Sequence, residues 1–267
     1  MASDAHAHPF DISRCVPNAE DERRLCGIAC AASAWGREDF SYNEQCALQT
    51  CPDAPMLLTF GVHPQMPLAQ KKNVQMRDSL DLLSALASQK RIDAAGECGF
   101  DLYNTAYRET ETIQNELFLK HIETALKYDL PLVLHVRRAM HKIFEYTGML
   151  KKIKSLVFHS YSGTAGEAQS LLKRGVNAYF SFGNALLLEH KRARECCAAL
   201  DIHRILFETD APYQARRGFE FSTYRDIYAI LNEAAQLRRQ AGIDTPVCTP
   251  DDLEQQTDIN FKEAFSV

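Results

Sequence analysis

Histidine and carboxylate side chains recur at the ends of short apolar segments of this 267-residue chain. His6 and His8 are two residues apart, so in a strand both imidazoles would point to the same side and could reach one ion. Nitrogen and oxygen ligands suit Zn2+, Mn2+ or a mixed binuclear centre and, with more water, Mg2+. The pattern predicts a hydrolytic site in which divalent cations activate a water molecule. Four more side chains of these two types end or follow apolar runs: Glu97, His135, His159 and Asp210.

Each of these residues also has an ordinary structural interpretation. A histidine inside an apolar strand, such as His135 or His159, is more often a buried core residue than a metal ligand. Asp210 follows an apolar segment, where an acid is often a helix cap or a turn residue. The joint order of the six residues on successive apolar segments is what favours a metal site.

Eight short apolar segments predict β-strands, and stretches with helical periodicity separate most of them. The expected strands are Ala5–His6, Leu25–Ala32, Met56–Val62, Arg91–Glu97, Pro131–Val136, Ser155–His159, Val176–Phe182 and Arg204–Glu208. The expected helices are Lys71–Ser88, Tyr107–Tyr128, Gly166–Lys173, Leu186–Leu200 and Tyr224–Ala241. The polar segment Asp244–Asp258 contains two prolines and predicts a loop before a short final helix, Phe261–Phe265.

This alternation predicts an α/β protein, and eight β/α units in a chain of this length are typical of a single (β/α)8 TIM barrel. We expect one hydrolase domain over residues 1–267. An open doubly wound sheet is the alternative, but the turn after the first strand lacks a glycine-rich phosphate loop. In a barrel the carboxyl ends of the strands form the active-site face. The six candidate ligands should therefore converge at one mouth, together with His63 after the third strand.

Composition and charge disfavour several other classes of protein. The net charge is −5 and no run of lysine and arginine stands out, so the sequence predicts no broad basic surface for duplex nucleic acid. Nine cysteines without a Cys-x-x-Cys pair are typical of reduced thiols in a cytoplasmic protein. No apolar stretch approaches the roughly 20 residues that span a bilayer, and no signal peptide is evident. We expect neither a membrane partner nor an obligate protein partner.

At six places the sequence resembles the TatD family of metal-dependent deoxyribonucleases, within the wider group of amidohydrolase-like barrels. The Glu-Thr-Asp-Ala-Pro-Tyr and His-x-x-Ser-Gly motifs are the most diagnostic. The resemblance implies a deoxyribonuclease with two divalent ions, Mg2+ or Mn2+ before Zn2+, that acts as a 3′-5′ exonuclease on single-stranded or frayed DNA. The matching segments extend over most of the chain in the family's order: Asp4–His8, Phe60–Pro64, Gly96–Asp101, Leu130–Arg137, His159–Gly163 and Glu208–Tyr213.

The same resemblance implies how the metal ligands divide between two ions. One ion would be held by residues from both ends of the chain, and the other by two successive strands. A single carboxylate would bridge the pair. The implied sets are His6, His8 and Asp210 for the first ion and His135 and His159 for the second, with Glu97 as the bridge.

Further residues are expected to act on the substrate. The resemblance implies that His63 contacts the scissile phosphate and that Asp210 also serves as general base. Arg137 could bind substrate phosphate, because a guanidinium matches phosphate oxygens bidentately. Arg216 and Arg217 are expected in the substrate groove, because their loop follows Asp210 at the mouth.

Two departures from the family concern the substrate groove rather than the metals. The family usually has an Asp where this chain has Arg138, and many members carry an Arg-Asn-x-Pro segment where Gln214–Glu220 has no Asn-x-Pro. Two other functions therefore stay open. An amide or ester hydrolase of the amidohydrolase type would often bridge its metals with a carboxylated lysine where this chain has Glu97. A non-catalytic barrel that serves as a binding scaffold is disfavoured, because all six candidate ligands are present.

Overall fold

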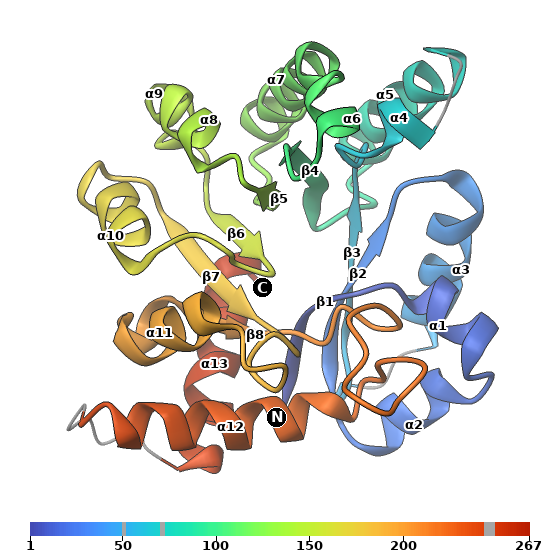
Figure 1. Cartoon of the computed structure of the whole chain (residues 1–267). Helices are drawn as coiled ribbons and strands as arrows, with labels where there is room; N and C mark the ends of the chain where they lie inside the picture. Colours follow the sequence, from blue (N-terminus) through green and yellow to red (C-terminus); the bar gives the residue numbers. More distant parts are fainter. Residues whose placement is uncertain (50–51, 70–72, 243–248) are drawn as a thin grey trace.

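Eight parallel strands alternate with helices in the computed structural model, which describes residues 1–49, 52–69, 73–242 and 249–267 (Figure 1). Each strand pairs with the next one in sequence, in the order β1 to β8. The chain therefore has the TIM-barrel fold that the alternation of apolar segments predicts. The strands are β1 (Ser3–Ala7), β2 (Ala29–Ala34), β3 (Met56–Phe60), β4 (Ala94–Asp101), β5 (Leu132–Arg137), β6 (Leu156–His159), β7 (Ala178–Phe182) and β8 (Ile205–Phe207).

The barrel is nearly closed between its first and last strands. The backbone N–H of Asp210, just after β8, donates to the carbonyl of His6 (3.0 Å), and that of His8 donates to the carbonyl of Ala211 (2.8 Å). The Asp4 carboxylate accepts from both the N–H (2.9 Å) and the hydroxyl (2.6 Å) of Thr209. Residues from the two ends of the chain are therefore held side by side at one rim of the barrel.

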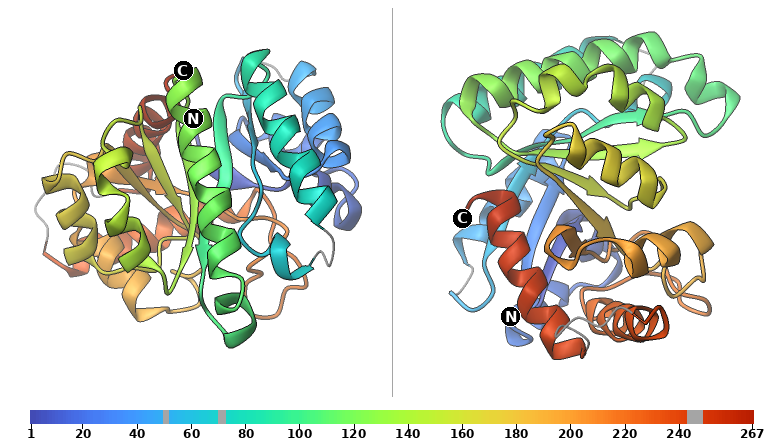
Figure 2. Two further views of the ribbon diagram at one scale, coloured as in Figure 1. Left: turned by 90° about the horizontal axis from the view of Figure 1, so that it is seen from above. Right: turned by 90° about the vertical axis from the view of Figure 1, so that its left-hand side faces the viewer.

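Helices surround the outer side of the sheet (Figures 1 and 2). None of the helices in the described ranges combines the length and the apolar character needed to cross a bilayer. The helices are α1 (Pro9–Cys15), α2 (Ala19–Leu25), α3 (Arg37–Leu48), α4 (Met66–Ala69), α5 (Asn73–Ser88), α6 (Thr105–Arg108), α7 (Glu111–Tyr128), α8 (Met140–Glu145), α9 (Thr147–Leu150), α10 (Ala165–Lys173), α11 (Lys191–Ala199), α12 (Asp226–Gln240) and α13 (Pro250–Phe265), with a 3-10 turn, η1 (Ile202–Arg204).

Apolar side chains fill one end of the barrel interior. Three residues of α13 belong to the same cluster, so the last helix covers this end (Figure 2, right). Side chains alternate along a strand, so residues two positions beyond Val133 and Val157 point into the same interior, nearer the opposite rim. Those residues are His135 and His159. The cluster comprises Ala5, Ala29, Ala31, Leu57, Ala94, Val133, Val157, Tyr179 and Leu206 of the strands with Phe261, Ala264 and Phe265 of α13.

The expected loop at Asp244–Asp258 is wrong for most of its length. Its first five residues lie outside the described part of the chain, but α13 begins at Pro250, well before the expected Phe261–Phe265. The Thr249 hydroxyl accepts from the N–H of Asp252 (3.1 Å), and the Asp252 carboxylate accepts from the N–H of Thr249 (3.1 Å). This reciprocal cap followed by a proline is a helix start that the polar composition concealed.

The region before β2 also differs from the expectation. Leu25, expected to open the strand Leu25–Ala32, instead ends α2 and is 88% exposed. Gly27 then adopts the left-handed conformation (φ +64°), so the strand begins only at Ala29. Helices α1 and α2 are seven residues each, which is too short for helical periodicity to be recognised. The sequence therefore predicted neither of them. It also did not predict the 12-residue α3, whose buried face includes the polar residues Asp39 and Asn43.

Expected helix starts differ from the structure. The helices expected from Tyr107 and Tyr224 begin at Glu111 and Asp226. The helix expected at Leu186–Leu200 begins at Lys191, because residues 184–189 form turns in which the N–H of Leu186 bonds to the carbonyl of Gly183 (3.0 Å). The helix expected from Lys71 is described from Asn73 onwards, and Lys71 itself lies outside the described residues.

Candidate active site

The barrel brings the seven expected histidine and carboxylate side chains together at the carboxyl ends of its strands. The six expected metal ligands are each less than a tenth exposed. Alternation along the strands turns the ligands of β5 and β6 inward, above the apolar interior. In chain order the residues are His6 and His8 (in and after β1), His63 (after β3), Glu97 (β4), His135 (β5), His159 (β6) and Asp210 (after β8).

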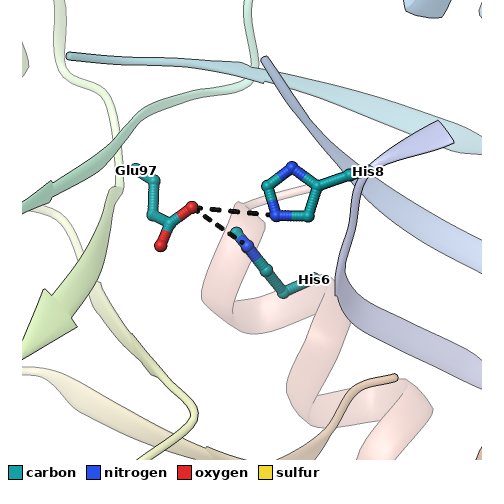
Figure 3. Close-up of side chains that lie close together, drawn as sticks. All are labelled: His6, His8 and Glu97. Carbon is teal, nitrogen blue, oxygen red and sulfur yellow. Dashed lines mark ion pairs between the residues drawn. The ribbon is translucent and has the colours of Figure 1, made fainter. Parts of the chain in front are cut away.

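The Glu97 carboxylate lies within this cluster, and its two oxygens face different histidines. Oε2 lies 3.3 Å from His6 Nε2 and 3.9 Å from His8 Nε2 (Figure 3). Oε1 lies 2.9 Å from His159 Nε2 and 3.0 Å from His135 Nδ1. One carboxylate therefore lies between two groups of imidazole nitrogens.

Asp210 and His63 each join one of these two groups. Asp210 Oδ1 lies 3.4 Å from His8 Nε2. His63 Nε2 lies 3.2 Å from Glu97 Oε1 and 3.3 Å from His135 Nδ1, as close as the expected ligands are. The side chain of His63 is 19% exposed, against 11% for His135, so it is the most open histidine of the cluster.

The charges around Glu97 compensate one another. Burial by itself would raise the pKa of Glu97, but the neighbouring imidazoles, His63 and His159 foremost, hold that pKa well below its usual value. Burial would likewise lower the pKa of His159, yet Glu97 and Glu208 raise it well above its usual value. Glu97 is therefore ionised and places a negative charge at the centre of the cluster.

Three overlapping sets of these side chains could hold a divalent metal ion, and in each set the ligand atoms lie within 4.8 Å of one another. His6 Nε2 is buried and has no hydrogen-bond partner among the described residues, which leaves a nitrogen available to a cation. Imidazole nitrogens with carboxylate oxygens are a donor set that fits divalent transition metals. The three sets are His6, His8 and Glu97; His6, His159 and Asp210; and His63, Glu97 and His135.

Two further carboxylates hold the far sides of the histidine rings. Asp101 Oδ2 lies 3.1 Å from His135 Nε2, and Glu208 Oε1 lies 3.2 Å from His159 Nδ1. Each contact leaves the other ring nitrogen facing Glu97. A carboxylate behind a ligating imidazole fixes its orientation and makes it a better donor. Neither role was expected from the sequence, although each acid lies within four residues of an expected ligand.

Asp210 is positioned by the loop that follows β8. Its Oδ2 accepts from Gln214 Nε2 (2.6 Å), and the same nitrogen donates to Ser160 Oγ (2.6 Å). Burial would raise the pKa of Asp210, but the hydrogen bond from His8 and the charges of the other nearby histidines lower it to about 2. The carboxylate is therefore ionised at neutral pH, with Oδ1 facing the cluster. Gln214 and Ser160 were not expected at the site.

The three arginines expected in the substrate groove have different surroundings. Arg137, at the end of β5, has a side chain that is 43% exposed, with one guanidinium nitrogen 3.5 Å from Asp101 Oδ2. Arg217 is exposed on the loop after β8. Arg216 lies 2.9 Å from Asp226 Oδ1 and 4.4 Å from the centre of the Phe219 ring. Arg216 therefore links its own loop to α12, while Arg217 stays open to solvent.

Replacing Arg216 with Gln should lower the free energy of unfolding by about 1–3 kcal/mol, because the buried Asp226 loses a charged hydrogen-bond partner. Arg217→Gln removes the same charge from an exposed position and should change that free energy by less than about 0.5 kcal/mol. Urea unfolding of both variants provides the measurement. Equal midpoints for the two variants would show that the contact with Asp226 contributes nothing to stability.

Comparisons with known proteins match nearly the whole chain. A sequence profile of the family described as TatD related DNase matches residues 3–266. An uncharacterized metal-dependent hydrolase of Mycoplasma pneumoniae is 32% identical over 240 residues, 82% of this chain and 84% of the relative. The 3′-5′ ssDNA/RNA exonuclease TatD of Cronobacter turicensis is 33% identical over 159 residues, 58% of this chain and 57% of the relative. The crystal structure of the TatD homologue YjjV of Escherichia coli K12 aligns with a TM-score of 0.80 at 24% identity, over 100% of this chain and 98% of that one.

Proposed function

Because the chain belongs to the TatD related DNase family of metal-dependent hydrolases, we propose that it removes nucleotides from the 3′ end of single-stranded or frayed DNA. The observation that carries the proposal is the position of Glu97 between two groups of imidazole nitrogens. A carboxylate with one oxygen toward each group suits a pair of divalent cations. We propose Mg2+ or Mn2+ as the ions, with Zn2+ as the third candidate.

The proposed ligand sets follow the two sides of Glu97. Cations bound there would supply a water nucleophile at neutral pH and stabilise the attacking and leaving oxygens of a phosphodiester. The protein's part is to hold the donor atoms in fixed directions, which Asp101 and Glu208 do from behind two of the rings. The sets are His6, His8 and Asp210 on one side, His135 and His159 on the other, and Glu97 in both.

Proton transfer is assigned to Asp210. Its Oδ2 is already bound to Gln214, so Oδ1 is the atom proposed to accept the proton of the attacking water. A carboxylate that is ionised at neutral pH is in the right state to accept it, as a general base must be.

His63 and Arg137 are proposed to contact the scissile phosphate. His63 Nδ1 accepts from the backbone N–H of Gln65 (3.1 Å), so a neutral ring carries its proton on Nε2. Burial lowers the pKa of His63, which favours that neutral ring. Nε2 faces the cluster and is therefore placed to donate to a phosphate oxygen, while the Arg137 guanidinium at the rim adds charge where the phosphate enters.

The proposed substrate follows from the enclosure of the site and from a relative. Because the candidate ligands are almost fully buried, a phosphodiester must leave a stacked duplex to reach them. The Cronobacter turicensis relative is named a 3′-5′ ssDNA/RNA exonuclease, and we extend that polarity to this chain. An unpaired 3′ end of DNA can enter the enclosed site and fits the 3′-5′ polarity, so we propose it as the substrate.

We expect end-labelled single-stranded DNA to be shortened by the protein with Mg2+ or Mn2+, and EDTA to abolish the shortening. A 5′ label should give a ladder of progressively shorter products, whereas a 3′ label should be released at once as a mononucleotide. A blunt duplex of the same sequence is the matched control and should be shortened more slowly. If the metal-loaded protein leaves DNA and RNA intact but hydrolyses esters or amides, the amide or ester hydrolase replaces this proposal.

A further inference from the structure

Two arginines and a tyrosine form a cationic cluster at the barrel mouth, at the carboxyl ends of β4 and β5. The guanidinium carbon of Arg137 lies 4.3 Å from the centre of the Tyr103 ring, and that of Arg138 lies 4.5 Å from it. One nitrogen of Arg138 also donates to the backbone carbonyl of Tyr103 (3.3 Å). Tyr103 is 45% exposed and Arg138 is exposed, so solvent reaches the cluster.

The charge of this cluster is only partly neutralised. Arg137 shares the Asp101 carboxylate with His135 and with Gln65, whose Nε2 donates to it at 2.7 Å. Within the described ranges, no carboxylate pairs with Arg138. An unpaired guanidinium at a solvent-accessible rim is available to bind an anion, and its planar array of donors matches phosphate oxygens.

The cluster is tied to the metal-binding side chains by a short chain of contacts. Arg137 and Asp101 are paired neighbours in the register of β4 and β5, as are His135 and Gly99. Asp101 contacts Arg137 on one side and His135 on the other, and His135 contacts Glu97. A phosphate bound at this cluster would therefore lie just outside the phosphate at the candidate metal centre.

The backbone of Arg138 supports a specific role for its side chain. Its φ is +53°, in the left-handed region that glycine and asparagine adopt more readily than other residues. An arginine there carries a conformational cost that glycine would avoid, and such costs concentrate at binding sites.

We propose that Arg138, held by Tyr103, forms a phosphate subsite for the nucleotide next to the one that is cleaved, beside Arg137, which is assigned to the scissile phosphate. The inference rests on the proposed phosphodiesterase function and adds a substrate requirement to it. A substrate with a second phosphate beside the scissile phosphodiester binds better than one without. Tyr103 holds the two guanidinium groups through its ring. Contacts from a guanidinium to a phosphate carry no base sequence information, so we expect the subsite to accept any base.

The test compares three dinucleotides with a single phosphodiester: dTpdT, the same molecule with a 5′-phosphate, and the same molecule with a 3′-phosphate. We expect the wild type to cleave one of the phosphorylated forms with a kcat/KM about 10-fold above that of dTpdT, through a lower KM. The preferred form shows on which side of the cleaved bond the subsite lies.

Arg138→Asn should reduce this preference to about 2-fold or less, since asparagine accepts the left-handed backbone but carries no guanidinium. Arg138→Lys should retain part of the preference, because it keeps the charge without the bidentate array. Tyr103→Leu should lower it about 2- to 5-fold through loss of the ring contact. Arg192→Asn, which removes the same charge from the exposed outer helix α11, is the matched control and should not change it.

The urea unfolding midpoint distinguishes a purely structural role of Arg138 from a role in phosphate binding. In that case Arg138→Asn would lower the urea midpoint, whereas the phosphate subsite requires an unchanged or higher one. A wild type that cleaves all three dinucleotides equally well would overturn the subsite. If the wild type cleaves none, the proposed phosphodiesterase function is wrong. The subsite is then tested separately, by measuring the Kd of fluorescently labelled 5′-phosphorylated and 3′-phosphorylated dTpdT. A Kd for both that Arg138→Asn leaves unchanged would then overturn it.

Discussion

Glu97→Gln is expected to lower kcat/KM for single-stranded DNA by about 1,000-fold or more, because two cations would together lose the negative charge between them. The substitution keeps the size of the side chain, so the barrel should remain folded. In the wild type the two carboxylate oxygens of Glu97 face five histidines. In the variant, a neutral amide would take the place of that carboxylate. Metal content should fall together with activity.

The measurement combines single-strand degradation, metal analysis of the purified protein and a thermal unfolding curve. Glu116→Gln makes the same chemical change at an exposed position on α7 and should retain activity and metal content. A Glu97→Gln protein with normal metal content and less than a 10-fold loss of activity would show that Glu97 is required neither for metal binding nor for hydrolysis.

Gly61→Ala should disrupt both the fold and the site. A Cβ at this position would lie 2.6 Å from the backbone of Gly96 and 2.7 Å from the carbonyl oxygen of Glu97. Backbone atoms cannot move aside as a flexible side chain can, so overpacking should cost about 1–3 kcal/mol of unfolding free energy or more. The displaced segment carries Glu97, and a shift of about 1 Å can lower activity about 100-fold.

Gly148→Ala is the matched control, because, apart from its own helix backbone and chain neighbours, nothing lies within 4 Å of the Cβ that it would add. It lies in a helix, where alanine is preferred to glycine, so its stability should be equal or slightly higher. Urea unfolding and the degradation assay on both variants make the comparison. A Gly61→Ala protein as stable and as active as Gly148→Ala would show that the backbone at Gly96 and Glu97 can move away from position 61 without loss of stability or activity.

The sequence predicted the fold and which histidine and carboxylate side chains lie together at the barrel mouth, because both depend on local patterns. Apolar runs mark the strands, and in a barrel every strand ends at the same face, so His135 and His159 could be placed together without knowing any distance. The last helix was missed for the opposite reason. Its buried residues, Leu253 and Phe261 among them, are separated by polar ones, and the cap that starts it depends on two side chains, Thr249 and Asp252.

The supporting contacts of the site were beyond the sequence, because they join strands that are distant in the chain. Glu208 meets His159 across 49 positions and Asp101 meets His135 across 34. Nothing near either acid indicates which imidazole it contacts. The ion pair between Arg216 and Asp226 is likewise not visible in the sequence, because only the position of Arg216 after Asp210 can be read there.

The bonds that join Asp4 to Thr209 have a consequence for how the protein comes into being. During synthesis, His6 and His8 leave the ribosome about two hundred residues before Asp210, their neighbour in the finished barrel. The side chains from β4, β5 and β6 can meet before β8 has been made. The side chains that come from β1 and from the segment after β8 cannot. A nascent or truncated polypeptide that lacks β8 and Asp210 therefore lacks one side of the site, and hydrolysis that needs both sides has to wait until that segment has been made.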